Sequence, residues 1–239
     1  MKITIGHLFY DLLNLYGENG NVLALENALI SQGLEVEIKY LSIDNEPWNL
    51  DELDVVYIGA GTEQNQLLTL NILIKYKDEI NQMILNNKLF ICTGNSIELF
   101  GKQINQEDNV IETLNIFDYT TQRTSKRIVS ECVFNYDELK DKILGFENHQ
   151  GEIIGIAEPL FTVEKGYGSI TDSMIEGFKK NNFYGTYLIG PLLVRNPKLL
   201  EKICKELILS KYDTFNFKDF NLTLEQSAHD KFLLKYNKD

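Results

Sequence analysis

The first hundred residues alternate between short apolar runs and segments with helical spacing, and this alternation limits the possible folds more than any other feature. Strand-like apolar runs lie at residues 3–9, 34–43, 54–58 and 88–92. Helical patterns separate them at residues 22–32 and 63–86, and Gly33 follows the first helical pattern as a stop signal. Strand–helix–strand repetition of this kind predicts an α/β fold with a doubly wound, mainly parallel sheet and helices on both faces.

The second half contains further strand-like runs and little helical pattern until near its end. These runs are separated by turn residues and lie at 110–119, 127–134, 143–146, 153–156 and 184–193. We expect them to extend the same sheet, some as antiparallel strands. Helical spacing returns at residues 197–210, where Pro197 suits the first turn, and again at residues 224–236. No linker, repeat or low-complexity tract divides the chain, so we expect residues 1–239 to form a single domain.

Composition limits the kind of partner. The 239 residues are 44% hydrophobic and 24% charged, as in ordinary globular proteins, and the formal net charge is −12. An acidic balance of this size argues against nucleic-acid binding through a broad basic face, although a few clustered cations can still bind an anion. No run reaches the ~20 apolar residues of a membrane span, so we expect no membrane span.

Two further observations bear on location. The chain starts with a strand-like run instead of the charged and apolar regions of a signal peptide. The three cysteines, at positions 92, 132 and 204, are an odd number and have no metal-ligand spacing, which fits a reduced protein better than a disulfide scaffold. We therefore expect a cytoplasmic protein without a metal site.

Cys92 ends an apolar run and is followed by Thr93, Gly94 and a helix-like stretch. Many α/β enzymes present a nucleophile on such a turn between a strand and a helix, beside backbone N–H groups. A helix N-terminus also lowers the pKa of a nearby thiol. We interpret Cys92 as a candidate nucleophile. The alternative is a small buried residue at the end of a strand.

The preceding strand-like run ends in Gly59-Ala60-Gly61. In a doubly wound sheet, sites form outside the carboxyl ends of the strands, and small residues let backbone N–H groups approach a ligand. The N–H groups of Gly61 and Thr93 are therefore candidates for an oxyanion hole. The alternative is a tight turn that requires glycine for its backbone angles. The triplet is not a dinucleotide-binding motif, because position 64 is Gln instead of Gly.

Cations and one histidine add further candidates. Arg123, Lys126 and Arg127 lie within five residues and form either a local anion site or a solvated loop. His149 lies among polar residues and glycines, where it could line a cleft or serve as a hydrogen-bonded structural histidine.

Several short motifs, in the same order along the chain, resemble those of one family. The resemblance is to class I glutamine amidotransferases of the cobyric-acid-synthase-like type, in particular the small glutaminase subunits that pair with a Mur-ligase-like subunit in the synthesis of amidated lipid II. The matching motifs are Asp11-Leu12-Leu13-Asn14-Leu15-Tyr16-Gly17, Gly20-Asn21-Val22-Leu23-Ala24-Leu25, Gly59-Ala60-Gly61, Cys92-Thr93-Gly94, Gly145-Phe146-Glu147-Asn148-His149, Gly166-Tyr167-Gly168 and Gly185-Thr186-Tyr187-Leu188.

The resemblance implies hydrolysis of the side-chain amide of glutamine through a thioester on a cysteine. The ammonia would pass to the ligase subunit of a heterodimer, which would use ATP and Mg²⁺ to activate the D-glutamate of a lipid-linked peptidoglycan precursor. No cofactor is implied for this chain. By the resemblance, Cys92 is the nucleophile, Gly61 and Thr93 supply the oxyanion hole, and Arg127 matches an arginine associated with the lipid-linked substrate.

The chain departs from the family pattern at two functional positions. Ile189 stands where the family has its catalytic histidine, and it can neither accept nor donate a proton. In the family's Cys-Gly-Gly-Tyr-Gln turn, read from Cys92, the glutamine is Ser96 and the aromatic residue is Asn95. General acid–base help contributes ~10²–10⁴-fold in typical enzymes, so this loss is large.

Three hypotheses remain open from the sequence. The chain is an active glutaminase subunit in which His149 acts as a surrogate base, or a catalytically degenerate homologue that serves as a non-catalytic binding or regulatory subunit. The third hypothesis is that Cys92 performs other thiol chemistry on a different donor.

Overall fold

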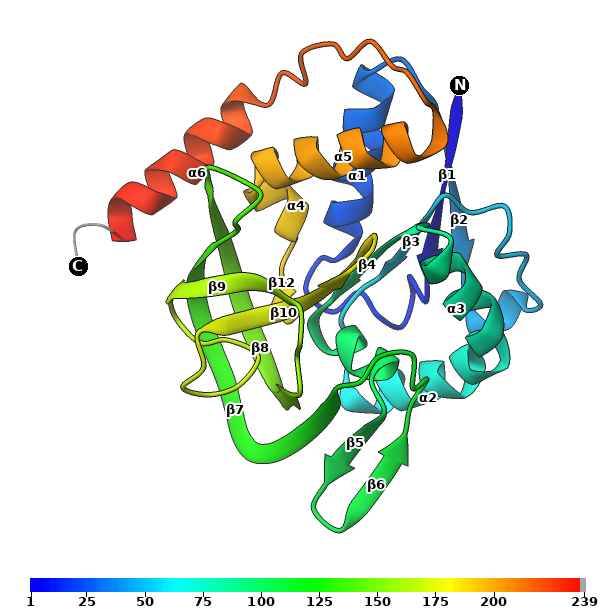
Figure 1. Ribbon diagram of the computed structural model, residues 1–239, viewed down its shortest axis with the longest axis vertical. Helices are drawn as coiled ribbons and strands as arrows, with labels where there is room; N and C mark the ends of the chain where they lie inside the picture. Colours follow the sequence, from blue (N-terminus) through cyan, green and yellow to red (C-terminus); the bar gives the residue numbers. More distant parts are fainter. Residues whose placement is uncertain (237–239) are drawn as a thin grey trace.

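Four parallel strands form the N-terminal half of the sheet in the computed structural model, which describes residues 1–236 (Figure 1). The strands are β1 (Lys2–Leu8), β2 (Glu35–Leu41), β3 (Val55–Ile58) and β4 (Leu89–Thr93). Strand β1 pairs in parallel with β2 and β3, and β3 pairs in parallel with β4. This arrangement confirms the predicted mainly parallel α/β sheet for this half.

Helices cover both faces of the parallel strands. Helices α1 (Asn19–Ser31) and α5 (Pro197–Lys211) pack on one face, where Leu25 and Ile203 join a core with Ile5. Helices α2 (Glu63–Leu73) and α3 (Lys77–Leu85) pack on the other face. The predicted helix at residues 63–86 is thus two helices, and the 3₁₀ turn η2 (Ile74–Tyr76) separates them.

The C-terminal half consists mainly of antiparallel strands that join the same sheet. They are β7 (Thr120–Asn135), β8 (Lys142–Ile154), β9 (Pro159–Lys165), β10 (Ile175–Lys180), β11 (Phe183–Thr186) and β12 (Leu188–Ile189). The strand order β12-β8-β7-β9-β10-β11-β4-β3-β1-β2 makes β11, which is parallel to β4, the link between the two halves. A short hairpin of β5 (Gln103–Gln106) and β6 (Asn109–Glu112) attaches to β7 (Figure 1).

Several predicted strand boundaries are wrong. The runs at residues 143–146 and 153–156 belong to one strand, β8, while the run at 110–119 contains only the end of β6 and a loop. The run at 184–193 divides into β11, β12 and the short helix α4 (Leu192–Arg195). Strand β12 pairs with β8 whereas β11 pairs with β4, and Gly190 turns the chain after β12 with a φ of +67°. Strands β9 and β10 were not predicted.

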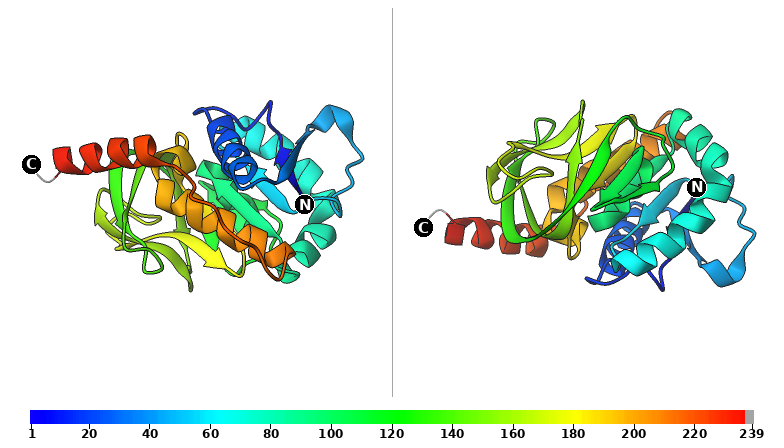
Figure 2. Two further views of the ribbon diagram at one scale, coloured as in Figure 1. Left: turned by 90° about the horizontal axis from the view of Figure 1, so that it is seen from above. Right: turned by 90° about the horizontal axis from the view of Figure 1, so that it is seen from below.

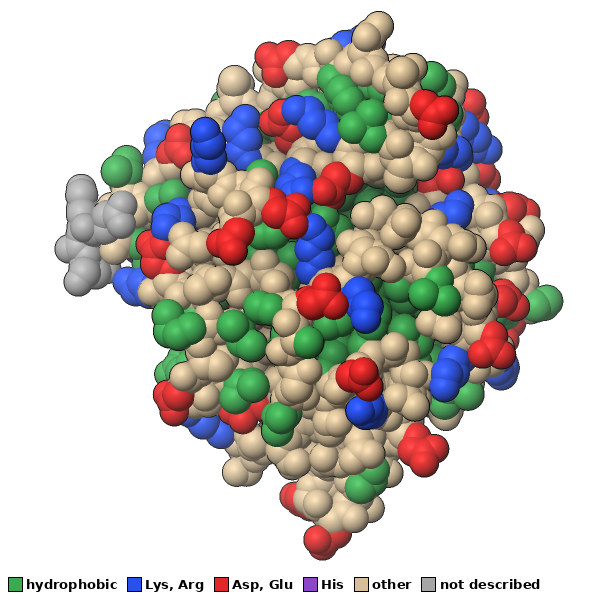
Figure 3. Space-filling model, viewed as in Figure 1, with side chains coloured by type: hydrophobic (Ala, Val, Ile, Leu, Met, Phe, Trp, Pro, Cys, Tyr) green, Lys and Arg blue, Asp and Glu red, His purple; other side chains and the backbone are tan. Residues whose placement is uncertain are grey.

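The last helix, α6 (Thr223–Tyr236), lies along one end of the molecule and extends away from the body (Figure 2). Acidic and basic side chains are interspersed over the face seen in Figure 3. Among the described residues, no helix is long and apolar enough to span a membrane. At the other side of the fold, the carboxyl ends of β3, β4 and β11 meet at one edge of the sheet, and the candidate site lies there.

Candidate functional site

Cys92 lies inside strand β4 and not on the turn that follows it. Its side chain is fully buried (0% exposed) in the core between the sheet and helices α2 and α3. Burial raises the pKa of the Cys92 thiol well above its usual value. The expected turn position and the expected lowered pKa are therefore both wrong, and the role of Cys92 as nucleophile stays a prediction without support from the geometry.

Gly94 is the residue that makes the turn. It has a φ of +60°, the left-handed conformation that glycine adopts without steric cost, and the 3₁₀ helix η3 (Gly94–Phe100) starts there. A Cβ placed on Gly94 would clash with the Cβ of Ala60 and would stand 2.8 Å from Cγ2 of Ile189. Ile189 therefore lies against the turn at Gly94, and the space around Gly94 has no room for a side chain.

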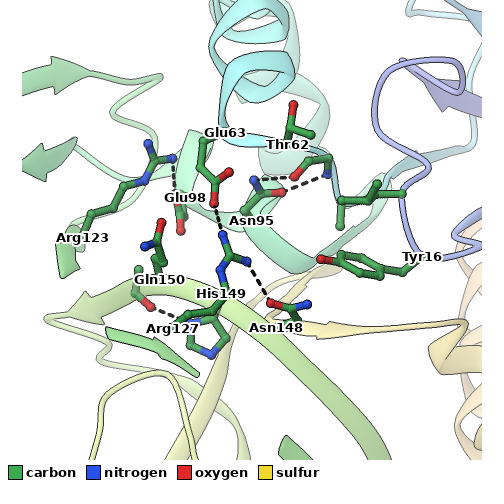
Figure 4. Close-up of a pocket in the computed structure, with 14 residues that line it drawn as sticks. Tyr16, Thr62, Glu63, Asn95, Glu98, Arg123, Arg127, Asn148, His149 and Gln150 are labelled. Carbon is green, nitrogen blue, oxygen red and sulfur yellow. Dashed lines mark hydrogen bonds and ion pairs between the residues drawn. The ribbon is translucent and has the colours of Figure 1, made fainter. Parts of the chain in front are cut away.

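The peptide groups of Gly61 are already hydrogen-bonded. The N–H of Gly61 donates to Oδ1 of Asn95 at 3.1 Å, and Nδ2 of Asn95 donates to the carbonyl of Gly61 at 3.0 Å (Figure 4). The hydroxyl of Ser96 donates to the carbonyls of Ile58 and Thr93 and holds the turn against β3. One of the two N–H groups expected to form an oxyanion hole is thus occupied by a side chain of the turn.

A buried acid lies beneath the turn. The fully buried Glu18 accepts hydrogen bonds from the hydroxyls of Tyr57, at 2.5 Å, and Thr93, and from the N–H of Gly190 at 3.2 Å. Burial raises the pKa of Glu18. This cluster connects the start of α1 with β3, β4 and the segment after β12. Thr93, the other predicted oxyanion residue, is fully buried within it.

A second polar cluster fills the space beside the turn. Glu98 pairs with Arg123 at 3.0 Å, and both side chains are almost fully buried. Gln66 and the hydroxyl of Tyr187 donate further hydrogen bonds to Glu98, each at 3.0 Å. Sequence reasoning placed Arg123 in a cation group and missed Glu98. The sequence did contain a signal for Glu98, which is a carboxylate within an apolar run. A carboxylate in such a run is seldom buried without a charged partner, so a buried cation elsewhere in the chain was to be expected.

A cavity of about 170 Å³ lies between the turn, the start of α2 and the strands β7 and β8. Of the predicted site residues, it brings together Gly61, Arg127 and His149, but not Cys92, Thr93 or Ile189. The full lining is Leu15, Tyr16, Ala60, Gly61, Thr62, Glu63, Asn95, Glu98, Arg123, Arg127, Asn148, His149, Gln150 and Gly151.

Arg127 is one of the residues that line this cavity. Its guanidinium donates to the carboxylate of Glu63 at 2.7 Å and to Oδ1 of Asn148 at 2.8 Å (Figure 4). Arg127 and Glu63 are each 40% exposed, so solvent screens their ion pair. Lys126, from the same predicted group of cations, lies over the ring of Tyr167.

The side chain of His149 is buried and packed in the way that is typical of a structural histidine. Its ring stacks on that of Tyr187, with centroids 3.8 Å apart, and Nδ1 lies 2.7 Å from the carbonyl of Gly151. Burial lowers the pKa of His149 to about 4. Within residues 1–236, no hydrogen bond joins the Cys92 sulfur to His149 or to any other group, and no cluster of side chains suitable for a metal ion is present. The structure therefore does not bring the proposed surrogate base to Cys92.

The sequence matches a known family over most of its length. Residues 4–197 match the model of the CobB/CobQ-like glutamine amidotransferase domain. The chain belongs to this family. This membership agrees with the resemblance that the sequence motifs indicate.

Two of the proteins to which this chain is similar are subunits of one kind of enzyme. The chain is 33% identical to the GatD subunit of the glutamine-hydrolysing lipid II isoglutaminyl synthase of Staphylococcus aureus, over 85% of each chain. It is 27% identical to the Streptococcus pneumoniae GatD subunit, over 88% of this chain and 82% of that protein. It is 26% identical to a probable cobyric acid synthase of Methanosphaera stadtmanae, of which it covers only 37%.

Solved structures support the fold of this family member. A glutamine amidotransferase crystal structure superimposes with a TM-score of 0.57 at 13% identity, covering 85% of this chain and 98% of that one. A second glutamine amidotransferase, from Thermotoga maritima, gives a TM-score of 0.52 at 14% identity, covering 98% and 93%. At these identities the likeness concerns the fold alone.

Proposed function

We propose that this chain is a non-catalytic member of the glutamine amidotransferase family, which keeps the fold of a glutaminase subunit but does not hydrolyse glutamine. The observation that carries the proposal is the turn after β4. Gly94 occupies the turn, and Ala60 and Ile189 fill the space that a nucleophilic side chain would need.

The position of the turn also changes how the family motif fits this sequence. The Cys-Gly-Gly-Tyr-Gln motif fits the geometry better when its cysteine is placed on Gly94 instead of Cys92, because the nucleophile of such a turn stands at the strained residue between strand and helix. In this register the glutamine of the motif corresponds to Glu98. The nucleophile position is then Gly94, which has no side chain. The base position is Ile189, whose hydrocarbon side chain cannot transfer a proton.

The remaining groups do not replace the missing chemistry. A nucleophilic thiol must reach the substrate as a thiolate, whereas Cys92 is fully buried and its pKa is raised. An oxyanion hole must offer free N–H groups, whereas that of Gly61 donates to Asn95. These observations favour the degenerate subunit over the active glutaminase with His149 as base.

The relatives suggest the setting in which such a subunit would act. Similarity over 85% of both chains to a GatD subunit supports a heterodimer with a Mur-ligase-like subunit, acting in the cytoplasm on a lipid-linked peptidoglycan precursor. In this proposal ATP and Mg²⁺ bind the ligase subunit, and this chain holds no cofactor. The ligase would then use free ammonia, because this chain would not release it from glutamine.

A glutaminase assay tests the proposal. The purified chain, alone and together with a co-expressed ligase subunit, should release no glutamate from glutamine above the background of a heat-denatured sample. A family member that carries cysteine and histidine at the two positions serves as the positive control. Glutamine turnover that disappears in Cys92→Ala would contradict the proposal and favour the active glutaminase.

A further inference from the structure

Strand β2 ends the sheet and leaves one side unpaired (Figure 1). In a strand, the N–H and C=O of one residue point to the same side, and successive residues alternate. The N–H of Glu35 donates to β1 through Met1, and the carbonyl of Leu41 accepts from Phe9. The odd-numbered residues of β2 therefore face β1, and Val36, Ile38 and Tyr40 direct their backbone groups outward.

These outward groups are mostly free. In the described part of the chain, the backbone groups of Val36 and Ile38 have no hydrogen-bond partner beyond β2, and only the carbonyl of Tyr40 accepts one bond, from Nδ2 of Asn45 at 2.8 Å. The side chains of Val36 and Ile38 are half-buried against the core beneath α1, which holds the strand in place. An ordered seven-residue edge of this kind is a template for another strand.

The side chains of β2 are self-complementary about Ile38. The strand reads Glu35-Val36-Glu37-Ile38-Lys39-Tyr40-Leu41. If a second copy pairs antiparallel with Ile38 opposite Ile38, each Glu37 lies opposite the Lys39 of the other copy, and each Val36 lies opposite a Tyr40. Opposite charges placed across two strands stabilise the pair by ~0.2–1 kcal/mol each, and like charges destabilise it.

We propose that β2 is an interface between two copies of this chain, which pair antiparallel about a two-fold axis through Ile38. A two-fold interface requires that residue i meets residue j and residue j meets residue i, and the Glu37–Lys39 pair meets this condition. The alternative is that the charges simply protect the edge, as lysines commonly do on exposed strands. Within the chain, Glu37 already pairs with Lys2 at 2.8 Å and Lys39 pairs with Glu52. A second copy would place a further opposite charge across the axis from each of them, and no like charges would meet.

The charge pattern gives the first test. Wild-type protein should sediment as a concentration-dependent dimer, since two paired edge strands bury less than the ~1,200–2,000 Å² of stable interfaces. Lys39→Glu places two like-charged pairs across the axis and should shift the protein to monomer. The double variant Glu37→Lys/Lys39→Glu restores opposite charges and should restore the dimer. Glu52→Gln, which removes the partner of Lys39 within the chain, should leave the dimer intact.

Cysteine cross-linking gives the second test, because it reports which residues of the two β2 strands lie opposite each other. Ile38 opposite Ile38 would be a hydrogen-bonded pair with Cα atoms about 5.5 Å apart, within the range of a disulfide. Under mild oxidation, Ile38→Cys should form a covalent dimer, while Val36→Cys, which would lie opposite Tyr40, should not. The three native cysteines are buried and give little background. Equal cross-linking of both variants, or a wild-type chain that stays monomeric at every concentration, would overturn the proposal.

Discussion

The side chain of Asn95 forms two hydrogen bonds with the backbone of Gly61, one to its N–H and one to its carbonyl. This pairing joins the turn after β4 to the turn after β3 at the edge of the sheet where sites form in doubly wound folds. It also uses one of the two N–H groups that the sequence predicted for an oxyanion hole. The hydrogen bonds of Asn95 therefore hold the two turns together and do not leave the N–H of Gly61 free for a ligand.

We predict that Asn95→Ala lowers the free energy of unfolding by about 1–3 kcal/mol, because two hydrogen bonds of ~0.5–1.5 kcal/mol each are lost. Urea unfolding followed by circular dichroism measures the change. Asn109→Ala, on the exposed β5–β6 hairpin, is the control and should have little effect. The prediction fails if the two variants are equally stable.

The Arg123–Glu98 pair makes a second prediction. Removing one partner of a buried ion pair leaves an uncompensated charge, so Arg123→Ala should cost about 3–5 kcal/mol. Replacing both residues in Arg123→Met/Glu98→Gln removes both charges and keeps an acceptor for Gln66 and Tyr187, so it should restore part of the lost stability. Urea unfolding of the three proteins measures this, and a double variant less stable than Arg123→Ala would contradict the argument.

The sequence predicted the parallel half of the fold well because hydrophobic period and turn residues are local signals. It misplaced the turn by two residues, because β4 extends through Thr93 by pairing with Thr186 of β11. That pairing joins positions about ninety residues apart. The Arg123–Glu98 cluster was missed for a similar reason, since its members belong to β7 and η3 and meet only when the chain folds. Strand β9 alternates only weakly between apolar and polar residues, and Gly177 interrupts the alternation of β10.

Glu147 makes the stability of the protein depend on pH. Its side chain is fully buried, accepts a hydrogen bond from the thiol of Cys132 and lies near the buried Glu176; burial, followed by the charge of Glu176, raises the pKa of Glu147 to about 9. Above pH 4.5 the unfolded state loses the Glu147 proton while the folded state keeps it. The folded state then binds more protons, so stability falls as pH rises from about 5 to 9.

The slope contributed by Glu147 is at most about 1.4 kcal/mol per pH unit. Glu147→Gln keeps the hydrogen-bonding shape without the ionisable group, so its free energy of unfolding should fall less over this interval. Urea unfolding of both proteins at a series of pH values provides the comparison. Parallel curves for the wild type and the variant would show that Glu147 ionises normally in the folded state.

Thiol reactivity gives a direct view of Cys92. All three cysteines are buried, and burial raises the pKa of each thiol. We predict that a glutamine-mimicking electrophile does not label the native protein, whereas an excess of a general thiol reagent labels all three cysteines after unfolding in urea. Mass spectrometry of the intact protein counts the labels. Rapid single labelling of native protein that disappears in Cys92→Ala would show an accessible, reactive thiol at this position.

Gly94 and Gly17 allow the crowding at the turn to be measured separately from backbone strain. Both have positive φ, +60° and +76°, but a Cβ on Gly17 meets nothing within 4 Å, whereas a Cβ on Gly94 meets Ala60 and Ile189. Gly17→Ala should cost only the strain of a left-handed alanine, about 1–3 kcal/mol. Gly94→Ala should cost more, since backbone strain and steric overlap add. The double variant Gly94→Ala/Ile189→Ala lacks one of the two contacts. Its loss of stability should therefore be smaller than the sum of the losses of Gly94→Ala and Ile189→Ala, although the contact with Ala60 remains. Equal losses for the two glycine variants, measured by urea unfolding, would mean that the turn has room for a side chain, and the case for a non-catalytic site would lose its main support.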